Sequence, residues 1–300
     1  MATKRKNPAD VAPRSPNPSE ASGAKGSRIN RTSTFYLRTI QQAIDVGTTL
    51  RGSWFRGHDE IYKNLTPKIY RKGPFERGRY REYWAAAHFR LRARAIEPKV
   101  PAWDEHVSWL LLMQHHGAPT RLLDWTESIL TALYFALQGP ADKAAEVWCI
   151  RPDKLNNLQG YFLCGPDRPA IKYLAAEVFL IDNEIKTFSE ALKLSVLPKY
   201  PFAFVPPMEF RRMSAQSSRF TIHPTPTRNN AIEGLLNGAN QIVRYEIPCE
   251  CKPSLSRDLT ALGVTAELLF HSLDALSQTI TEEIYDPDRL DSYPDPPSFT

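Results

Sequence analysis

Residues Gln114 to Thr126 read QHHGAPTRLLDWT, and this stretch decides the fold around it. Apolar residues at helical spacing predict one helix over 105–116, which ends inside the stretch, and a second over 127–138, which follows it. The second helix has one apolar face, formed by Ile129, Leu130, Leu133, Tyr134 and Leu137. Pro119 indicates a turn between the two helices. The stretch is therefore expected to join two helices through a turn.

Shorter patterns elsewhere in the chain predict both helices and strands. Helices are expected over 34–46, over 80–97, in a segment that starts at Pro253, and near 271–282. Strands are expected at Ser53–Gly57, Glu146–Ile150, Arg219–His223 and Gln241–Ile247. Because the strands cluster after helices without regular alternation, we expect an α+β fold with small mixed or antiparallel sheets flanked by helices.

Composition divides the chain into three parts. Residues 1–33 are rich in Pro, Ser, Ala, Gly and Lys and have few large apolar side chains, which predicts a disordered tail. Seven Lys or Arg residues stand there against Asp10 and Glu20, so this basic tail accounts for the whole net charge of +5. Residues 286–300 form an acidic, Pro-rich tail. The folded domain is therefore expected to span 34–285.

The chain shows neither a charged leader followed by an apolar run nor an apolar segment of about 18 residues, so we expect a cytoplasmic protein without membrane spans. Its cysteines are scattered: Cys149, Cys164, Cys249 and Cys251. They lack the two spaced pairs that are typical of a zinc site. We therefore expect reduced thiols, no disulfide framework and no metal.

Several motifs occur together along the chain: Trp54-Phe55-Arg56-Gly57, Leu65-Thr66-Pro67 with Tyr70-Arg71, Gln114 to Thr126, Leu133-Tyr134-Phe135-Ala136, Trp148 with Pro152 and Asn156, Arg212 with Ala215-Gln216, and Phe220-Thr221-Ile222-His223. In this combination residues 50–275 resemble the FRG domain family, which is named after Phe-Arg-Gly. The chain departs from the family pattern late, at Ser217-Ser218 and from Phe270 to Asp274. Family members occur in bacteria and phages, often near defence or toxin genes. The resemblance thus implies an effector in phage defence or toxicity.

Part of this pattern is also similar to ADP-ribosyltransferases, which consume NAD. Those enzymes have an Arg-Gly pair on a first strand, and a second strand ending in Ser or Thr that leads into an Ala- and Phe-rich helix. Arg56-Gly57 resembles the first element, and Arg121 to Thr126 followed by Thr131 to Ala136 resembles the second. The resemblance implies an ADP-ribosyltransferase-like fold with NAD bound as a substrate.

The same resemblance implies roles for individual residues. The fork of donors on Arg56 would hold a phosphate, Trp125 would stack on nicotinamide or adenine, and Thr126 would bind the ribose. The predicted catalytic residues are Arg56, Asp124, Gln216 and His115, and the residues expected around NAD are Arg56, Gly57, Arg121, Trp125 and Thr126. Gln216 stands near the place of a late-strand Glu, so Asp124 is expected to supply the missing carboxylate.

Most of these side chains also have a structural interpretation. Arg121 and Asp124, three residues apart, could form an internal ion pair, and Trp125 could fill the core. Gln216 could tie backbone groups together. His115 could face Asp124 as an oriented base, or it could cap the end of a helix.

A second feature is the stretch 68–99, where ten Lys or Arg residues are interleaved with aromatic side chains. With the basic N-terminal tail, it predicts a nucleic-acid surface; a solvated helix face is the alternative. Two functions follow from the sequence. One is ADP-ribosyl transfer to a macromolecule, and the other is a module that binds nucleic acid or a phosphorylated ligand without turnover. A nuclease using His115 or His116 ranks last, because no acidic cluster accompanies them.

Overall fold

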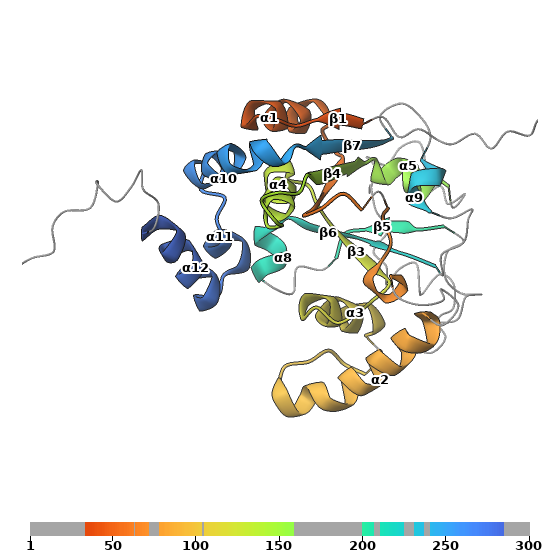
Figure 1. The fold of residues 1–300 in the computed structure, drawn as a ribbon. Helices are drawn as coiled ribbons and strands as arrows, with labels where there is room; N and C mark the ends of the chain where they lie inside the picture. The colour runs from red at the N-terminus through yellow and green to blue at the C-terminus, as the bar shows by residue number, and fades with distance from the viewer. Residues whose placement is uncertain are drawn as a thin grey trace, which may run out of the picture. The chain divides into compact units, whose positions relative to one another are not determined.

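The computed structural model describes residues 34–62, 64–71, 78–103, 105–158, 200–206, 211–224, 231–236 and 241–284. In chain order the elements are β1 (Thr34–Tyr36), α1 (Ile40–Thr49), β2 (Trp54–His58), the 3-10 helix η1 (Lys68–Tyr70), α2 (Gly78–Ile96), α3 (His106–His115), β3 (Leu122–Thr126), α4 (Ile129–Leu137), β4 (Ala145–Ile150), α5 (Pro152–Asn157), β5 (Phe202–Phe204), α8 (Arg211–Ala215), β6 (Ser218–Ile222), α9 (Ile232–Leu235), β7 (Ile242–Ile247), the 3-10 helix η3 (Cys249–Cys251), α10 (Lys252–Ala261), α11 (Ala266–Phe270) and α12 (Leu273–Ile284) (Figure 1).

The strands form one seven-stranded sheet in the order β1-β7-β4-β2-β3-β6-β5. Strand β1 runs parallel to β7, and every other neighbouring pair is antiparallel. The predicted α+β class with a mixed sheet and flanking helices is therefore confirmed. The expected small sheets are replaced by a single large one, because β2 and β3 join its two halves.

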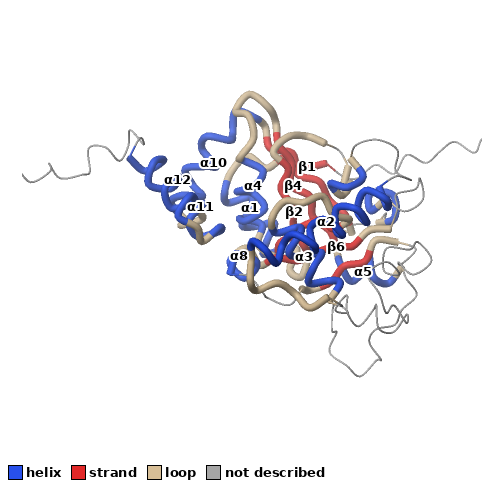
Figure 2. The backbone as a smooth tube through the Cα atoms, turned by 90° about the horizontal axis from the view of Figure 1, so that it is seen from below, coloured by secondary structure: helices blue, strands red, loops and turns tan. Residues whose placement is uncertain are grey.

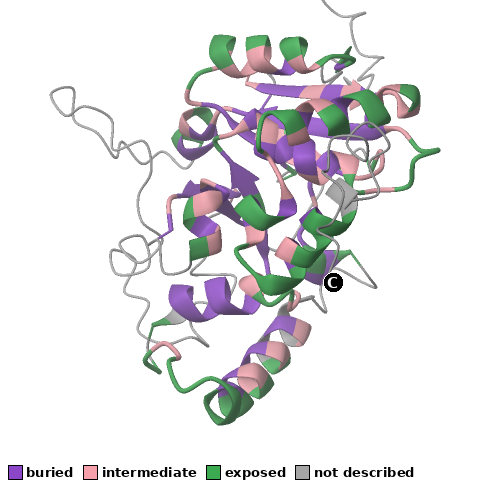
Figure 3. Cartoon of the chain, turned by 90° about the vertical axis from the view of Figure 1, so that its left-hand side faces the viewer, coloured by how far each residue is buried: buried purple, intermediate pink, exposed green. Residues whose placement is uncertain are grey.

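Helices cover both faces of the sheet, which Figure 2 shows as red strands running between blue helices. On one face, α1, α4 and α10 pack against β2, β4 and β7, with Leu133 and Val147 in the shared core. On the same face, α2 and α3 pack against β3, β5 and β6 around Leu111. The opposite face carries a third core with Trp54 and Trp148, beside α5 and α9. The strands are largely buried, as the purple of Figure 3 shows.

Most predicted elements are confirmed within a few residues, but the helix expected over 34–46 is wrong at its start. Thr34–Tyr36 is strand β1, paired with residues 244–246 of β7. Helix α1 begins only at Ile40, because Thr39 caps it. The Thr39 hydroxyl accepts the backbone N–H of Gln42 at 3.3 Å, and the Gln42 side chain accepts the backbone N–H of Thr39 at 3.3 Å. This reciprocal capping box ends the preceding extended segment.

Three predictions concern residues outside the described ranges: the two tails, 1–33 and 286–300, and Cys164. Cys149, Cys249 and Cys251 are free thiols. Within the described ranges, no helix combines the length and the apolar character needed to cross a membrane.

Gly57 lets α4 lie directly on the sheet. A Cβ at this position would stand 1.9 Å from the carbonyl oxygen of Ala132 and 2.7 Å from the backbone nitrogen of Ala136. Phe55, on the same face of β2, is buried in the core with α4, while Arg56 projects to the opposite face. The three residues Phe-Arg-Gly therefore supply a core anchor, a polar side chain and a helix contact in succession.

Candidate functional site

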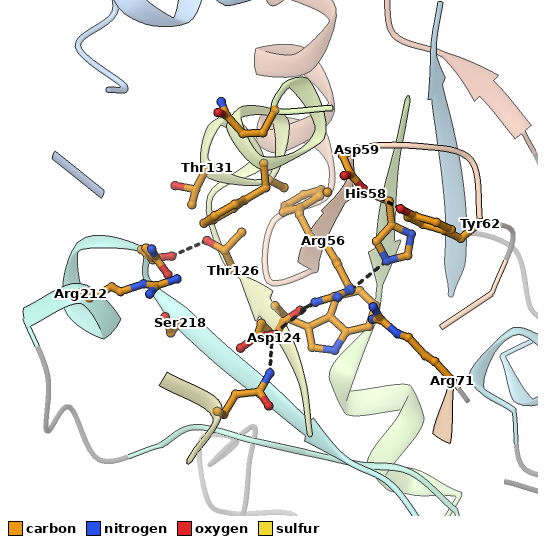
Figure 4. A pocket seen from close by; sticks show the side chains of 18 residues that line it. Arg56, His58, Asp59, Tyr62, Arg71, Asp124, Thr126, Thr131, Arg212 and Ser218 are labelled. Carbon is orange, nitrogen blue, oxygen red and sulfur yellow. Dashed lines mark hydrogen bonds and ion pairs between the residues drawn. The ribbon is translucent and has the colours of Figure 1, made fainter. Parts of the chain in front are cut away.

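A cleft of about 510 Å³ opens beside β2 and β3 (Figure 4). Its walls come from β2 and the loop after it, from β3 and α4, and from the segment that joins α8 to β6. The lining residues are Phe55, Arg56, Gly57, His58, Asp59, Tyr62, Arg71, Gln114, Asp124, Trp125, Thr126, Thr131, Ala132, Phe135, Gln138, Arg212, Gln216 and Ser218. Segments more than 150 residues apart in sequence thus meet at one site.

The cleft lies where β2 and β3 separate. Between Trp54–His58 and Leu122–Thr126 the register holds the single pair Phe55–Thr126, whereas β2 pairs with β4 along its whole length. The guanidinium of Arg56 spans this gap. Its Nη1 donates to the backbone carbonyl of Asp124 at 2.7 Å and stands 3.6 Å from Asp124 Oδ2. The Arg56 side chain therefore takes the place of a backbone hydrogen bond that longer pairing of β2 with β3 would supply, and it also lines the cleft.

Asp124 presents its carboxylate to the cleft, with 53% of the side chain exposed. Gln114 Nε2 donates to Asp124 Oδ2 at 2.7 Å, and Gln114 Oε1 accepts from the Thr120 hydroxyl. Among the described residues, Asp124 Oδ1 has no hydrogen-bond partner. The carboxylate is thus held in one orientation and keeps one oxygen available for a ligand.

Three guanidinium groups surround the cleft, on Arg56, Arg71 and Arg212. Arg71 Nε donates to the Thr66 carbonyl at 3.0 Å, and Arg212 lies over the ring of Phe270 at 4.6 Å from its centre. Burial lowers the pKa of Arg56 and of Arg212, and the Asp124 carboxylate opposes both shifts. Arg56 and Arg212 nevertheless stay charged, because guanidinium is not deprotonated in proteins. Since Asp59 and Asp124 are the carboxylates among the lining residues, the cleft carries a positive excess.

A chain of polar contacts runs from Arg56 into the protein. Arg56 Nε donates to His58 Nε2 at 3.0 Å, and His58 Nδ1 lies 2.9 Å from Glu146 Oε1. Glu146 is fully buried; it accepts the backbone N–H of Tyr62 at 3.1 Å, and its other oxygen lies 3.4 Å from Arg244 Nη1. The side of the Arg56 guanidinium that faces away from Asp124 is therefore fixed by the buried residues His58 and Glu146.

Of the residues that the sequence singles out, Arg56, Gly57, Asp124, Trp125, Thr126 and Gln216 all line the cleft. Besides Arg56 and Asp124, three of them also have partners within the protein. The Thr126 hydroxyl donates to the Gln216 carbonyl at 2.7 Å, and Trp125 Nε1 donates to the Thr221 hydroxyl at 2.9 Å. Gln216 Nε2 donates to the Leu269 carbonyl at 3.1 Å. Trp125 is part of the core, as its structural interpretation predicts, and the Gln216 side chain binds one backbone carbonyl.

Arg121 does not line the cleft. It is 1% exposed and forms an ion pair with Glu82 of α2, which also accepts the Arg121 backbone N–H at 2.9 Å. Burial alone would lower the pKa of Arg121, but Glu82 and Tyr70 together outweigh this effect, so the pKa is raised. The predicted Arg121–Asp124 ion pair is wrong, because residues three apart in an extended segment project to opposite faces. Asp124 faces Arg56 instead.

His115 lies in a smaller recess beside the cleft, together with Asp124, Arg212 and Ser218. The ring is half-buried; burial lowers the pKa of His115, and the positive charge of Arg212 adds to that effect. At neutral pH the imidazole is therefore uncharged and able to accept a proton. Because Asp124 borders both spaces, a ligand in the cleft and a group in the recess would meet at the same carboxylate.

The described part of the stretch 68–99 has both buried and exposed basic side chains. Arg90 is 4% exposed, with its guanidinium 3.9 Å from the ring centre of Trp103, and Glu82 is the buried partner of Arg121. Arg92 and Arg94 of α2 remain at the surface. The described part of this stretch thus contributes both to the core and to the solvent face.

Several lining residues were not singled out from the sequence, among them Asp59, Tyr62, Arg71, Gln114 and Arg212. Three of these, Arg71, Gln114 and Arg212, stand inside motifs that carry the resemblance, so their positions were a usable signal. Asp59 and Tyr62 reach the cleft through the path of the loop after β2, for which the sequence offers no pattern.

Residues 51–145 match the family model of the FRG domain. The match includes β2, β3 and α4, which form three sides of the cleft; the resemblance proposed for 146–275 lies beyond the matched residues. No curated protein and no solved structure matches the chain.

Proposed function

Since residues 51–145 of this chain are an FRG domain, we propose that its cleft binds NAD and transfers the ADP-ribose group to an acceptor. One observation carries this proposal: Arg56, Asp124, Thr126 and Gln216, which come from three separate parts of the chain, converge on a single cleft. A concave site with a few aimed polar groups is the usual form of a ligand site.

The charges of the cleft suit a diphosphate. Arg56, Arg71 and Arg212 outnumber the two lining carboxylates, and guanidinium groups bind phosphate oxygens through paired N–H donors. Phe135 and Tyr62 add aromatic surface on which a nucleotide ring can stack. NAD combines these features, since it has a diphosphate between two nucleosides.

Asp124 would act on the reacting ribose. In the proposed step the bond between ribose C1′ and the nicotinamide nitrogen breaks, and its electron pair leaves with nicotinamide. A lone pair of the acceptor forms the new bond to C1′, and the acceptor's proton passes to a base. Positive charge builds at C1′ during this exchange, and a fixed carboxylate stabilises it. Asp124 is oriented for this by Gln114.

His115 would accept the proton. Its imidazole is kept neutral by burial and by Arg212, and it stands in the recess that borders Asp124. An acceptor that enters through the recess would therefore lie next to both the Asp124 carboxylate and the His115 base.

A binding module without turnover is the second candidate. It is favoured by the side chains of Thr126, Trp125 and Gln216, whose polar atoms are already engaged in the fold. In that case the same arginines would hold a phosphorylated ligand, and Asp124 would only orient Arg56.

The experiment uses the full chain, NAD labelled in its adenine and a cell lysate as the source of acceptors. We expect nicotinamide release and transfer of label by the wild-type protein, and release about a hundredfold slower for Arg56→Ala, in line with the loss of one charge-stabilising donor. Arg257→Ala, an exposed position on α10, is the matched control and should behave as wild type.

Two outcomes would contradict transfer. A wild-type protein that neither releases nicotinamide nor labels any fraction would exclude it. Calorimetric binding of ADP-ribose, lost in Arg56→Ala and not accompanied by turnover of NAD, would establish the binding module instead. Thermal unfolding of each variant shows whether it is folded.

A further inference from the structure

We infer that His58 is a positioning residue, which holds the Arg56 guanidinium in the cleft by accepting its Nε–H. The inference rests on the proposed function for its kinetic readout, but its structural readout is independent of NAD. His58 has no place in the family motif Phe-Arg-Gly, and it follows Arg56 by two residues on the same face of β2.

The hydrogen-bond directions define which form of the imidazole is required. An arginine Nε–H can only donate, so His58 Nε2 must be an unprotonated acceptor for the 3.0 Å contact. The hydrogen of the ring then sits on Nδ1, where Glu146 Oε1 accepts it at 2.9 Å. Histidine protonated on both nitrogens would lose the bond to Arg56 and would bring a second positive charge beside it.

The groups around His58 maintain this form. Burial lowers the pKa of His58, the hydrogen bond to Glu146 opposes that shift, and the charge of Arg56 supports it. Arg71 adds a smaller effect in the same direction, and the Tyr62 ring packs against the imidazole in a T-shaped arrangement with the ring centres 5.4 Å apart. Glu146 is itself anchored across the sheet by Arg244.

The orientation of the Arg56 guanidinium therefore depends on His58, which lies behind it. Two hydrogen bonds fix the Arg56 guanidinium: Nη1 donates to the Asp124 carbonyl, and Nε donates to His58 Nε2. Together they hold the plane of the guanidinium, and the edge that remains is available to a phosphate of a bound nucleotide. Losing one of the two contacts would leave the charge in place but allow the plane to rotate.

Two substitutions separate this role from a general role in folding. In His58→Gln, the amide oxygen can take the place of Nε2 and accept from Arg56. In His58→Asn, the shorter side chain can still donate to Glu146 but cannot reach Arg56. We expect Asn at this position to raise the KM for NAD about tenfold to a hundredfold with a smaller change in kcat, and Gln to stay within about threefold of wild type.

Equal losses in both variants, with an equal drop in thermal stability, would show that His58 serves only the fold and would overturn the inference. Wild-type kinetics in both would overturn it as well. If the protein does not turn over NAD, calorimetric binding of ADP-ribose replaces KM, and the same contrast between Gln and Asn is expected.

Nitrogen NMR of histidine-labelled protein gives the independent readout, with the His58 signals assigned from their loss in His58→Gln. We expect Nε2 to be unprotonated and Nδ1 to carry the hydrogen at neutral pH, and the Nε2 signal to shift in Arg56→Lys. A protonated Nε2 would overturn the inference whatever the protein does with NAD.

Discussion

Arg56 Nη1 donates a 2.7 Å hydrogen bond to the backbone carbonyl of Asp124, 68 positions later in the chain. The bond spans the gap where β2 and β3 part, so one side chain both completes the sheet and lines the cleft. The Phe-Arg-Gly motif and the Gln114–Thr126 stretch, far apart in sequence, are therefore two sides of one structure. Their joint occurrence has a physical cause in this contact.

Replacing Gly57 by alanine should destabilise the protein. The added Cβ would fall 1.9 Å from the Ala132 carbonyl oxygen, and neither β2 nor α4 can yield without moving the core. We expect the free energy of unfolding to drop by about 3 kcal/mol, the upper range for overpacking. Gly234→Ala is the control, because no atom lies within 4 Å of its added Cβ. Equal unfolding midpoints in urea for the two variants would contradict the packing argument.

Removing one partner of the buried Arg121–Glu82 ion pair should lower the free energy of unfolding strongly. Glu82→Ala leaves a buried guanidinium without its carboxylate, and we expect a loss of about 3–5 kcal/mol in unfolding free energy. The double variant Glu82→Leu with Arg121→Met should recover much of that loss, since apolar residues of similar size avoid the unpaired charge. Additive effects of the two sites in a double-mutant cycle would argue against a coupled pair.

Asn156 should be needed for the edge strand β5. Its side chain accepts the backbone N–H of Ala203 at 2.7 Å and donates to the Ala203 carbonyl at 2.8 Å, as a neighbouring strand would. Asn156→Ala leaves both backbone groups without these bonds and should cost about 2–3 kcal/mol. The exposed neighbour Asn157 provides the control, and Asn157→Ala should change the unfolding free energy little. A similar small change in both variants would show that β5 does not depend on Asn156.

His223 should make stability fall in acid. Burial lowers the pKa of His223 from 6.5 to about 3, with Arg56 and Arg121 adding to the shift. In the unfolded chain the ring takes up a proton below about pH 6.5, whereas in the folded protein it resists until about pH 3. Between about pH 6.5 and pH 3 the unfolded state therefore binds more protons than the folded state. The contribution of neutral, buried His223 to the stability of the folded protein is present above pH 6.5 and is lost as the pH falls toward 3.

Urea unfolding of the wild type and of His223→Gln between pH 7 and pH 4 measures this contribution. The variant should show a shallower decline, by up to about 1.4 kcal/mol per pH unit, the value for one proton. Parallel slopes for wild type and His223→Gln would contradict a buried neutral histidine.

Elements with a long regular pattern could be predicted from the sequence, and short ones could not. Helix α4 and strand β4 are defined by their own apolar residues. Strand β1 has three residues and exists because β7, more than 200 positions later, pairs with it. Such a strand has no local signal, and the start of the helix that follows it cannot be predicted from the sequence for the same reason.

The site shows the same division. Arg56 and Asp124 could be selected because they stand in motifs with unusual polar residues beside apolar strands. The orientation of the Arg121 side chain could not be predicted, because it depends on Glu82, which lies 39 positions earlier on helix α2. His58 could not be selected from the sequence, because a histidine at a strand end is ordinary and its contacts with Arg56 and Glu146 form only when β2 and β4 are paired.

The central claim is that Asp124 acts on a nucleotide held by Arg56, and the Asp124→Asn variant tests it most directly. Asparagine keeps the shape of the side chain, and the backbone carbonyl that binds Arg56 is unchanged, so ADP-ribose should bind within a few-fold of wild type. Nicotinamide release from NAD should fall about a hundredfold or more, because the charge that stabilises the ribose centre is gone. Asp45→Asn on the exposed face of α1 is the control. Wild-type rates of nicotinamide release in Asp124→Asn would contradict the account.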